Sequence, residues 1–383
     1  MNIEKVVSKI KSEWVNGNVK NYVFVFLYAD NKGISVEQAC SELQFTPDFE
    51  SKYIAHTKEY RVKKLRDLRD LCRKIELKDI GVFCDLILLT YSESGGKCAG
   101  QFFTPKEVAD LMARIGYADN ENIRTIYDPT CGAGNLLEAA RNTIKNDVVL
   151  YGTELNFSLL LGAKARFFNT KNELKHGDLF AVSDNNKYDF IMSNPPFNSN
   201  VKGTRWDKIY NKKISGDWAF ILEAFDKLKD GCLMCVQHMS SILYKNKDAF
   251  IRDKLADCIE GIIKLPLKIF SNTSISTVML VMRKGGRNGG MFCIDAMKSW
   301  GYTTNKKLNI VNTEAIFEVW KNKEPVKGKC GFCNDFNFYF EEEKQEEVID
   351  PRALLDELDK LDAKARENRQ RLRALVCELE RWH

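Results

Sequence analysis

The sequence lacks any long apolar run. A membrane-spanning helix needs about 20 consecutive apolar residues, and the longest candidate, residues 22–29, is far shorter. Glu4, Lys5, Lys9 and Lys11 lie within the first turns, which is not the pattern of a secretory signal peptide. We therefore expect a cytoplasmic protein with no membrane-spanning segment, in which residues 22–29 form a buried helix turn or strand.

A strong charge of either sign is also missing. The formal net charge is +5, and charged residues make up 29% of the chain. Such a balance fits a protein that meets nucleic acid, and it fits a neutral enzyme equally well. The composition is that of an ordinary globular protein. The length of 383 residues is enough for one large domain with smaller helical additions.

A cluster of cysteines with the spacing of a metal site is lacking as well. The twelve cysteines are scattered through apolar stretches, which indicates reduced, buried thiols. Cys232 and Cys235 form a C-x-x-C pair inside a strand-like run and belong in a core. The second pair, Cys330 and Cys333, could hold a metal, but a zinc site needs four ligands and a clear second pair is missing. We expect no metal site, and the role of this second pair stays open.

The chain does contain three stretches of different character. Residues 1–97 carry apolar residues at helix spacing among many charges and end in a loop-like segment, which predicts a helical N-terminal domain. Residues 98–345 are the second stretch. In residues 346–383 leucines recur in alternating steps of four and three, with a lone Asn368 in the seam. This heptad pattern predicts a C-terminal helix that packs on its own domain or on another chain.

The middle stretch alternates short apolar runs with helical segments. This alternation indicates an α/β fold with a doubly wound, mostly parallel, Rossmann-like sheet. Such sheets bind ligands at the carboxyl ends of their strands. The predicted strands are 125–127, 148–151, 190–192, 232–236, 259–263 and 277–282, and the predicted helices are 136–144, 158–168, 218–228 and 247–255.

Three motifs at predicted strand ends point to a nucleoside cofactor. The glycine-rich turn at residues 128–135 (DPTCGAGN) lets the backbone approach a ligand just before a helix, although alone it could be a tight connection. Glu154 follows at about the spacing at which an acidic residue hydrogen-bonds a ribose diol, and its motif holds no basic residue for a phosphate. Asp178 could accept a hydrogen bond from an adenine amine, with Phe180 as an apolar wall. These motifs favour a cofactor without phosphates.

The motif Ser193-Asn194-Pro195-Pro196-Phe197 follows the predicted strand that ends at Met192. Two prolines fix the backbone and remove amide donors, so carbonyl groups can face a ligand. The Asn194 side chain adds an acceptor, and two acceptors on one NH2 group would draw its lone pair out of ring conjugation. Phe197 offers a flat face for stacking a base. The motif therefore predicts a site that holds a planar NH2 group.

These elements resemble a known family, the adenine-N6 DNA methyltransferases, and in particular the modification subunit of type I restriction–modification systems. Residues 100–105 (GQFFTP), the glycine-rich turn and the Asn194 motif occur in the order of the gamma arrangement. The resemblance runs from about residue 100 to residue 284 and includes 265–270 (LPLKIF). It implies S-adenosylmethionine as cofactor, methyl transfer to N6 of adenine in double-stranded DNA, and extrusion of that base from the helix.

The same resemblance implies a role for each motif residue. Phe270 would be a second stacking face for the base. The base would be held by Asn194, Pro195, Pro196 and Phe197, and the cofactor by Gln101, Phe102, Phe103, Thr104, Pro105, Lys106, Asp128, Thr130, Cys131, Gly132, Ala133, Gly134, Glu154, Asp178 and Leu179.

The sequence departs from this family in two ways. The N-terminal helical part is short, and residues 284–347 are too few for a target-recognition domain. We therefore expect a separate specificity subunit, bound partly through the C-terminal helix; a coiled-coil homodimer is the rival. No nuclease motif or helicase phosphate loop is evident. An Asn-Pro-Pro-aromatic motif also occurs in methyltransferases of a protein glutamine amide or an RNA base amine. Those substrates remain alternatives, as does a scaffold without catalysis.

Overall fold

In the computed structural model the chain divides into two units, residues 1–340 and 341–383, and the sheet and helices α1 to α12 lie in the first unit. The predicted C-terminal helix and the predicted cofactor residues Gln101, Phe102 and Phe103 lie almost wholly outside the described residues. The predicted division of the chain after residues 97 and 345 stays a prediction. The described residues are 2–14, 18–47, 58–92, 104–181, 185–270, 275–287, 289–305 and 308–334, with Phe336, Phe338, Ala363, Lys364 and Asn368.

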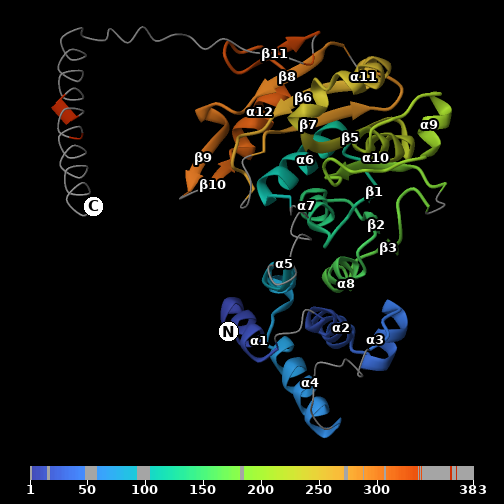
Figure 1. The fold of residues 1–383 in the computed structure, drawn as a ribbon, viewed down its shortest axis with the longest axis vertical. Coiled ribbons are helices and arrows are strands. Elements are labelled where there is room, and N and C mark those ends of the chain that lie inside the picture. Colours follow the sequence, from blue (N-terminus) through green and yellow to red (C-terminus); the bar gives the residue numbers. More distant parts are fainter. Residues whose placement is uncertain are drawn as a thin grey trace, which may run out of the picture. The chain divides into compact units, whose positions relative to one another are not determined.

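A large sheet forms the core of the chain from residue 125 onward (Figure 1). Its strands are β1 (Thr125–Asp128), β2 (Val149–Glu154), β3 (Asn172–His176), β4 (Tyr188–Ser193), β5 (Leu228–Met239), β6 (Ile259–Lys264), β7 (Thr277–Arg283), β8 (Met291–Asp295) and β11 (Cys330–Cys333). They lie in the order β11-β8-β6-β7-β5-β4-β1-β2-β3. β1 to β5 pair in parallel, whereas β7 and β11 run antiparallel to their neighbours. The predicted α/β fold with a mostly parallel sheet is confirmed.

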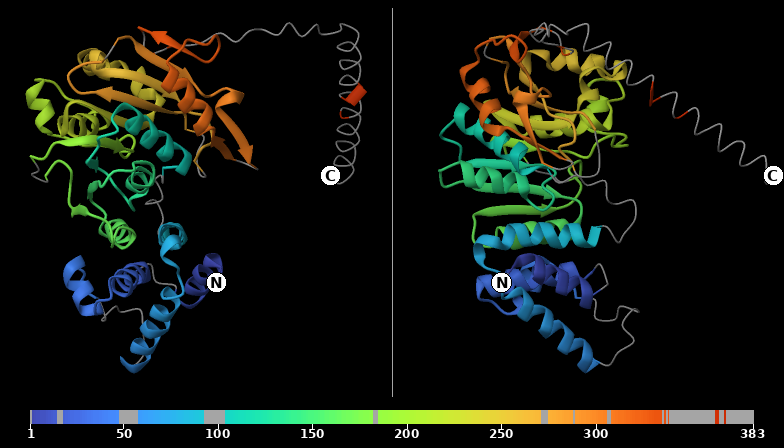
Figure 2. Two further views of the ribbon diagram at one scale, coloured as in Figure 1. Left: turned by 180° about the vertical axis from the view of Figure 1, so that it is seen from behind. Right: turned by 90° about the vertical axis from the view of Figure 1, so that its left-hand side faces the viewer.

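Helices cover both faces of this sheet (Figures 1 and 2). α6 (Lys106–Asp119), α7 (Asn135–Thr143) and α12 (Thr313–Asn322) share one apolar cluster with the sheet, and α10 (Gly216–Asp226) and α11 (Ala249–Leu255) share another. Residues of one strand alternate between the two clusters: Cys235 of β5 belongs to the first and Val236 to the second. Strands with both faces buried are nearly continuous apolar runs, which is why the sequence identifies β1, β2, β4, β5, β6 and β7. The mostly exposed strand β3 and the strands β8 and β11 were not predicted.

Before α6, the described residues form five α-helices, and these share one apolar cluster with α8 (Phe157–Arg166). They are α1 (Ile3–Glu13), α2 (Val19–Lys32), α3 (Val36–Leu43), α4 (Lys58–Cys72) and α5 (Ile80–Ser92). The stretch at residues 22–29, expected as a buried helix turn or strand, lies within α2. α8 therefore has two apolar sides: Leu160 and Ala163 face the sheet cluster, while Leu159 and Leu161 face the helical cluster.

A buried arginine ties these helices to the start of α7. The Arg166 side chain is 1% exposed and forms ion pairs with Asp85 of α5 and Glu138 of α7. It also donates to the Gly81 carbonyl at 3.0 Å, and Asp85 accepts from Asn135, the first residue of α7, at 3.3 Å. Removing one partner of such a buried set costs roughly 3–5 kcal/mol, because it leaves a charge uncompensated. These contacts thus connect the N-terminal helices to α7, the helix that follows the glycine-rich turn.

The second C-x-x-C pair lies on the edge strand β11. Residues three apart on a strand point to opposite faces, and Cys330 belongs to one apolar cluster whereas Cys333 packs against the other. Cys232 and Cys235 on β5 are divided between the two clusters in the same way. Neither pair can present both sulfurs to one metal ion. Among the described residues no cluster of His, Cys, Asp and Glu has the arrangement of a metal site.

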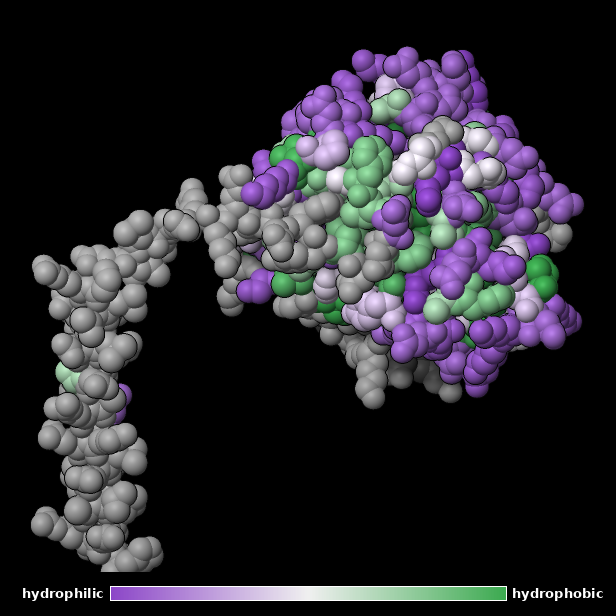
Figure 3. Space-filling model, turned by 90° about the horizontal axis from the view of Figure 1, so that it is seen from above, coloured by the Kyte–Doolittle hydropathy of each residue, from purple (hydrophilic) through white to green (hydrophobic). Residues whose placement is uncertain are grey.

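Within the described residues, no helix has the length and apolar character to cross a membrane. The face seen in Figure 3 carries hydrophobic residues gathered near its middle, with hydrophilic residues around them.

Two short strands, β9 (Tyr302–Asn305) and β10 (Leu308–Val311), form a separate antiparallel pair beside the main sheet.

Candidate active site

A cavity of about 330 Å³ lies at the carboxyl ends of β1, β2, β3 and β4. The chain leaves β1 toward β2 and β3 on one side, while β4 and β5 lie on the other, so this is the point where the strand order reverses. Open α/β sheets bind their ligands at that point. The lining residues are Thr104, Asp128, Pro129, Thr130, Cys131, Gly132, Ala133, Asn135, Leu136, Thr153, Glu154, Leu155, Leu159, Gly177, Asp178, Leu179, Asn194, Pro195, Pro196, Phe197 and Phe220.

The glycine-rich turn connects β1 to α7 along one wall of this cavity. Gly134 has a φ of 89° and caps α7, and a Cβ there would meet the Phe167 ring at 2.5 Å. Only glycine satisfies both conditions, because this backbone conformation is strained for other residues. The Cys131 amide donates to the Thr153 carbonyl at 3.0 Å, which holds the turn against β2. The amides at the start of α7 thus face the cavity as hydrogen-bond donors.

Two buried carboxyl groups lie beside this turn. Glu154, at the end of β2, accepts from the Gly132 amide at 2.8 Å and from the Asn156 amide at 2.6 Å. Asp128, at the end of β1, accepts from the Thr130 amide at 3.0 Å. Burial raises the pKa of Glu154, and burial together with the nearby Glu154 raises the pKa of Asp128 to about 8. Both groups therefore favour a cationic or hydrogen-bond-donating ligand, which would restore their charged form.

The third carboxyl group, Asp178, lies at the mouth of the cavity. It follows β3 and accepts from the Phe180 amide at 3.0 Å, while Leu179 is buried beside it. The turn is held to β2 because the Gly177 amide donates to the Glu154 carbonyl at 3.0 Å. Asp178 is exposed, so its carboxylate can reach a ligand without a large cost of desolvation.

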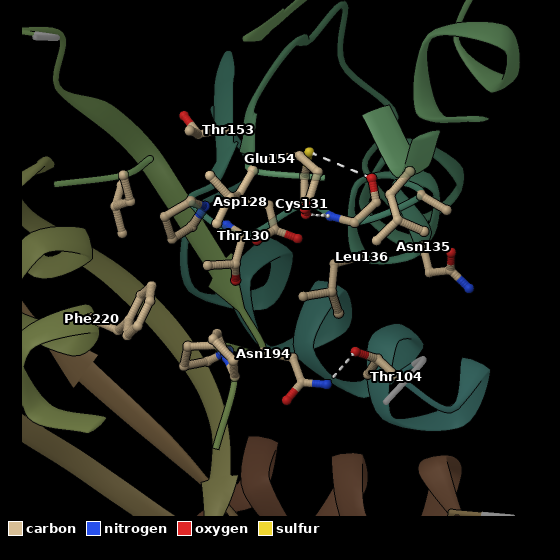
Figure 4. Close-up of a pocket in the computed structure, with 18 of the residues that line it drawn as sticks. Thr104, Asp128, Thr130, Cys131, Asn135, Leu136, Thr153, Glu154, Asn194 and Phe220 are labelled. Atoms are coloured by element: carbon tan, nitrogen blue, oxygen red, sulfur yellow. Dashed lines mark hydrogen bonds between the residues drawn. The ribbon is translucent and has the colours of Figure 1, made fainter. Parts of the chain in front are cut away.

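Asn194 lies at the opposite side of the cavity, next to Thr104 (Figure 4). Its Nδ2 donates to the Thr104 hydroxyl at 2.9 Å. This bond fixes the orientation of the amide and directs the side-chain oxygen away from Thr104. The family resemblance implied a cofactor contact for Thr104, whereas its observed contact orients the residue expected to hold the NH2 group.

The residues after Asn194 form a tight loop against α10. The Ser199 hydroxyl donates to the Pro196 carbonyl at 2.8 Å, which leaves the Pro195 carbonyl as the candidate second acceptor for an NH2 group. A Cβ on Gly216 would approach the Ser199 carbonyl oxygen to 2.1 Å, so the loop can rest on α10 only because residue 216 is glycine. Phe197 is half-buried and forms part of the cavity wall.

Most of the predicted site residues gather at this one cavity. Pro105, Lys106 and Gly134 adjoin residues that line it without lining it themselves. Phe270, predicted as a second stacking face, is 5% exposed and belongs to an apolar core cluster instead of the cavity wall. Phe220 of α10 does line the cavity and was not predicted. No motif surrounds Phe220 in the sequence; its position depends on how α10 packs.

The chemistry of the cavity fits a nucleoside cofactor without phosphates. Among the described lining residues none is Lys or Arg, so no side chain there would neutralise a phosphate. A carboxyl group lies at or just after the end of each of three neighbouring strands. There it can accept hydrogen bonds from the hydroxyl and amine groups of a nucleoside. Burial raises the pKa of the Cys131 thiol well above its ordinary value, so that thiol stays protonated and is a poor nucleophile.

Comparison with known proteins identifies a family. The model of the N-6 DNA methylase family matches residues 77–350. The type I restriction enzyme MpnII methylase subunit of Mycoplasma pneumoniae is 25% identical over 386 aligned positions, which cover 85% of this chain and 70% of that protein. The MjaVIII methylase subunit of Methanocaldococcus jannaschii is 26% identical over 312 positions, which cover 68% of this chain and 53% of that protein.

A solved structure shares the same fold. The methyltransferase subunit of a type I restriction–modification system from Streptococcus thermophilus superposes with a TM-score of 0.62 at 25% identity, covering 80% of this chain and 74% of that one. The chain spans about half the length of the Methanocaldococcus relative.

Proposed function

Because the chain belongs to the N-6 DNA methylase family, we propose that it transfers the methyl group of S-adenosylmethionine to the N6 atom of adenine in DNA. The observation that carries this proposal is a single continuous cavity with carboxyl groups at one end and the Asn194 motif at the other. A cofactor and a planar amine held in such a cavity would lie next to each other. The reacting atoms of the cofactor and of the amine would then be close enough to form a bond.

The carboxyl end of the cavity is proposed to hold the cofactor. Glu154 would accept from the ribose hydroxyls, Asp178 from the adenine amine, and Asp128 with the amides of the glycine-rich turn would bind the amino acid part. Bound S-adenosylmethionine would supply a methyl group already activated by its sulfonium charge. The protein therefore needs no nucleophilic side chain, which agrees with the protonated state of the Cys131 thiol.

The Asn194 end is proposed to hold the target adenine. The Asn194 side-chain oxygen and the Pro195 carbonyl accept the two N6 hydrogens, which concentrates the nitrogen lone pair toward the methyl group. A cofactor bound at the carboxyl end would supply its methyl group to N6, and the proton that N6 gives up would pass to solvent. Pro196 keeps the loop rigid, and Phe197 stacks on the base. Extruding the base costs a few kcal/mol, which these contacts offset.

Sequence specificity is proposed to come from another protein. Base-edge reading needs contacts beyond those to the DNA backbone, and residues 284–347 are too few for a recognition domain. We propose a cytoplasmic complex in which a specificity subunit binds partly through residues 350–383. Deletion of these residues should abolish complex formation while S-adenosylmethionine binding remains. A complex that survives the deletion would contradict this proposal, and a homodimer seen by light scattering of the isolated chain would favour the rival coiled coil.

A protein glutamine amide or an RNA base amine is the alternative substrate, because the same two acceptors fit any planar NH2 group. Incubation with methyl-labelled S-adenosylmethionine and separate samples of DNA, RNA and protein lysate distinguishes these classes. Label in DNA, lost with Asn194→Ala, is the expected result. Label only in protein or only in RNA would overturn the choice of DNA.

A further inference from the structure

A buried group of polar side chains lies directly behind Phe197, on the side away from the cavity. The Phe197 ring lies against His238, with ring centroids 5.0 Å apart and planes tilted by 49°. His238 is the penultimate residue of β5 and is fully buried. Since β5 pairs with β4, the imidazole lies beside the strand whose end carries the Asn194 motif.

Among the described residues the His238 ring makes one hydrogen bond, at Nδ1, and an electrostatic contact at Nε2 that is too long for a hydrogen bond. Nδ1 accepts from the Met239 amide at 2.9 Å, so the proton of the neutral ring is on Nε2. Nε2 lies 3.6 Å from Oδ1 of Asp217, whose side chain is 4% exposed. Burial lowers the pKa of His238, and the nearby Lys245 acts in the same direction, whereas Asp217 raises it. The ring is therefore neutral at neutral pH and has one fixed orientation.

Lys245 connects this group back to the Phe197 loop. Its Nζ donates to Oδ2 of Asp217 at 3.1 Å and to Oδ1 of Asn198 at 3.2 Å. Asn198 directly follows Phe197 and has a φ of 53°, a conformation that Asn tolerates better than most residues. The contacts thus form a closed circuit from Phe197 through His238, Asp217, Lys245 and Asn198, with residues drawn from three separate parts of the chain.

Stability alone does not explain this circuit. Burying a charged carboxylate and an imidazole costs more than burying apolar side chains of the same volume, and such replacements are often neutral or stabilising. Buried or half-buried polar groups that are hydrogen-bonded to their neighbours, as Lys245 is to Asp217 and Asn198, instead fix one arrangement of the groups around them. Here the groups held in place are the Phe197 ring in the cavity wall and Asn198, the residue that follows it.

We propose that Asp217, His238 and Lys245 are positioning residues that hold Phe197 at the angle needed to stack on the target base. The inference rests on the proposed function, since it assigns the stacking face of that site. A base that stacks at the wrong angle would present N6 away from the methyl group, so loss of this set lowers the rate of transfer. It leaves the cofactor end of the cavity unchanged.

The first test measures Phe197 directly and needs no substrate. 4-Fluorophenylalanine is placed at position 197 of the full chain, and its ¹⁹F NMR signal is compared between otherwise wild-type protein and His238→Ala. A single signal shifted away from that of the free amino acid is expected for the first. Broadened or several signals are expected for the second. An identical ¹⁹F signal in both proteins would overturn the proposal.

The second test separates positioning from folding. Asp217→Asn is compared with Glu223→Gln, a matched control because Glu223 is another buried acid of α10, paired with Arg205 instead of the Phe197 loop. With unmethylated genomic DNA and S-adenosylmethionine, Asp217→Asn should lower kcat about ten- to a hundredfold, the cost of a misplaced reacting group. KM for the cofactor should not change. Equal losses of kcat in both variants would contradict the proposal.

The two tests also distinguish the possible failures. If the wild-type chain together with its copurifying partner transfers no methyl group to DNA, the proposed function fails, and the ¹⁹F signal still decides whether His238 positions Phe197. If transfer occurs and neither variant changes kcat or the ¹⁹F signal, only the positioning role fails. His238→Gln, which keeps a polar side chain able to face Asp217, should restore part of the lost rate.

Discussion

The two ends of the cavity are built in different ways. At the carboxyl end, side chains are held by their neighbours in the chain: Asp128 by Thr130 at 3.0 Å and Glu154 by Asn156 at 2.6 Å. At the amine end, Asn194 is held by Thr104, 90 positions away, at 2.9 Å. Glu154 also accepts from the Gly132 amide, 22 positions away, at 2.8 Å. The carboxyl end is therefore built from the turns of neighbouring strands, whereas the amine end depends on how elements farther apart in the chain pack.

This difference implies that the two ends can be damaged separately. Under the proposed function, cofactor binding would use the turns after β1, β2 and β3, and transfer would further require the loop after β4 and its support from Thr104, α10 and β5. A variant at one end should leave the property of the other end nearly intact. Single substitutions at each end test whether cofactor binding and methyl transfer can be lost independently.

The largest effect is expected from Asn194→Ala. This change removes the oriented side-chain acceptor, and loss of one oriented hydrogen-bonding group at a reacting atom lowers kcat by about 10²- to 10³-fold. Equilibrium dialysis with labelled S-adenosylmethionine should show an affinity within about twofold of wild type, since no carboxyl group is touched. A parallel loss of cofactor affinity would mean that the two ends are not separable.

Glu154→Gln should weaken cofactor binding about ten- to 150-fold, because hydrogen bonds to a charged group contribute roughly 1.5–3 kcal/mol. Calorimetric titration with S-adenosylmethionine measures this loss. Glu173→Gln is the control, since Glu173 is an exposed acid on the adjacent strand β3. With saturating cofactor, kcat of Glu154→Gln should recover most of the wild-type value, and a kcat that stays low would place Glu154 in the chemical step.

Cofactor affinity should rise with pH up to about pH 8. Burial, with Glu154 nearby, raises the pKa of Asp128 to about 8, so below that pH the free protein carries a protonated carboxyl group. A cationic cofactor favours the carboxylate, and binding therefore releases a proton. One proton corresponds to at most about a tenfold gain in affinity per pH unit.

Titration in two buffers of different ionisation enthalpy counts the released protons. The count should fall toward zero above pH 8 and in Asp128→Asn at every pH. Proton uptake on cofactor binding, instead of release, would contradict the expected deprotonation of Asp128.

The smallest effect on transfer is expected from Phe270→Leu. Phe270 is buried in a core cluster away from the cavity wall, so the change should cost about 1 kcal/mol of unfolding free energy, as near-volume-conserving core changes do. Urea denaturation measures that cost, and kcat and both KM values should be unchanged. A raised KM for DNA would restore Phe270 as the second stacking face that the sequence predicts.

The sequence predicted the elements that carry their own local pattern. The glycine-rich turn and Glu154 follow strands that read as continuous apolar runs, so their shared position at the carboxyl edge could be expected before the fold was known. Asp178 follows the mostly exposed strand β3, and only its order after the other two motifs indicated its place. The position of Phe220 could not be predicted, because it lies on a helix surface with no motif and reaches the cavity only through the packing of α10. His238 lies in an apolar strand where the sequence indicates no partner.

The role of Thr104 shows the same limit. Its motif indicates the site, and the family resemblance implies cofactor contact, yet which ligand it serves depends on the distance between α6 and the end of β4. The hydrogen bonds that Asp85 accepts from Asn135 and from Arg166 could not be predicted from the sequence either, since the three residues lie on three helices. Local chemistry identifies the site, and tertiary packing decides how its side chains are oriented.

The most direct test is to identify the methylated atom. DNA lacking methylated adenine is incubated with the full chain, its copurifying partner and methyl-labelled S-adenosylmethionine, and the nucleosides are separated by mass spectrometry. The label should appear in N6-methyladenine and disappear with Asn194→Ala. Label in a methylated cytosine, or no label in DNA while protein becomes labelled, would contradict the proposal that this cavity methylates adenine.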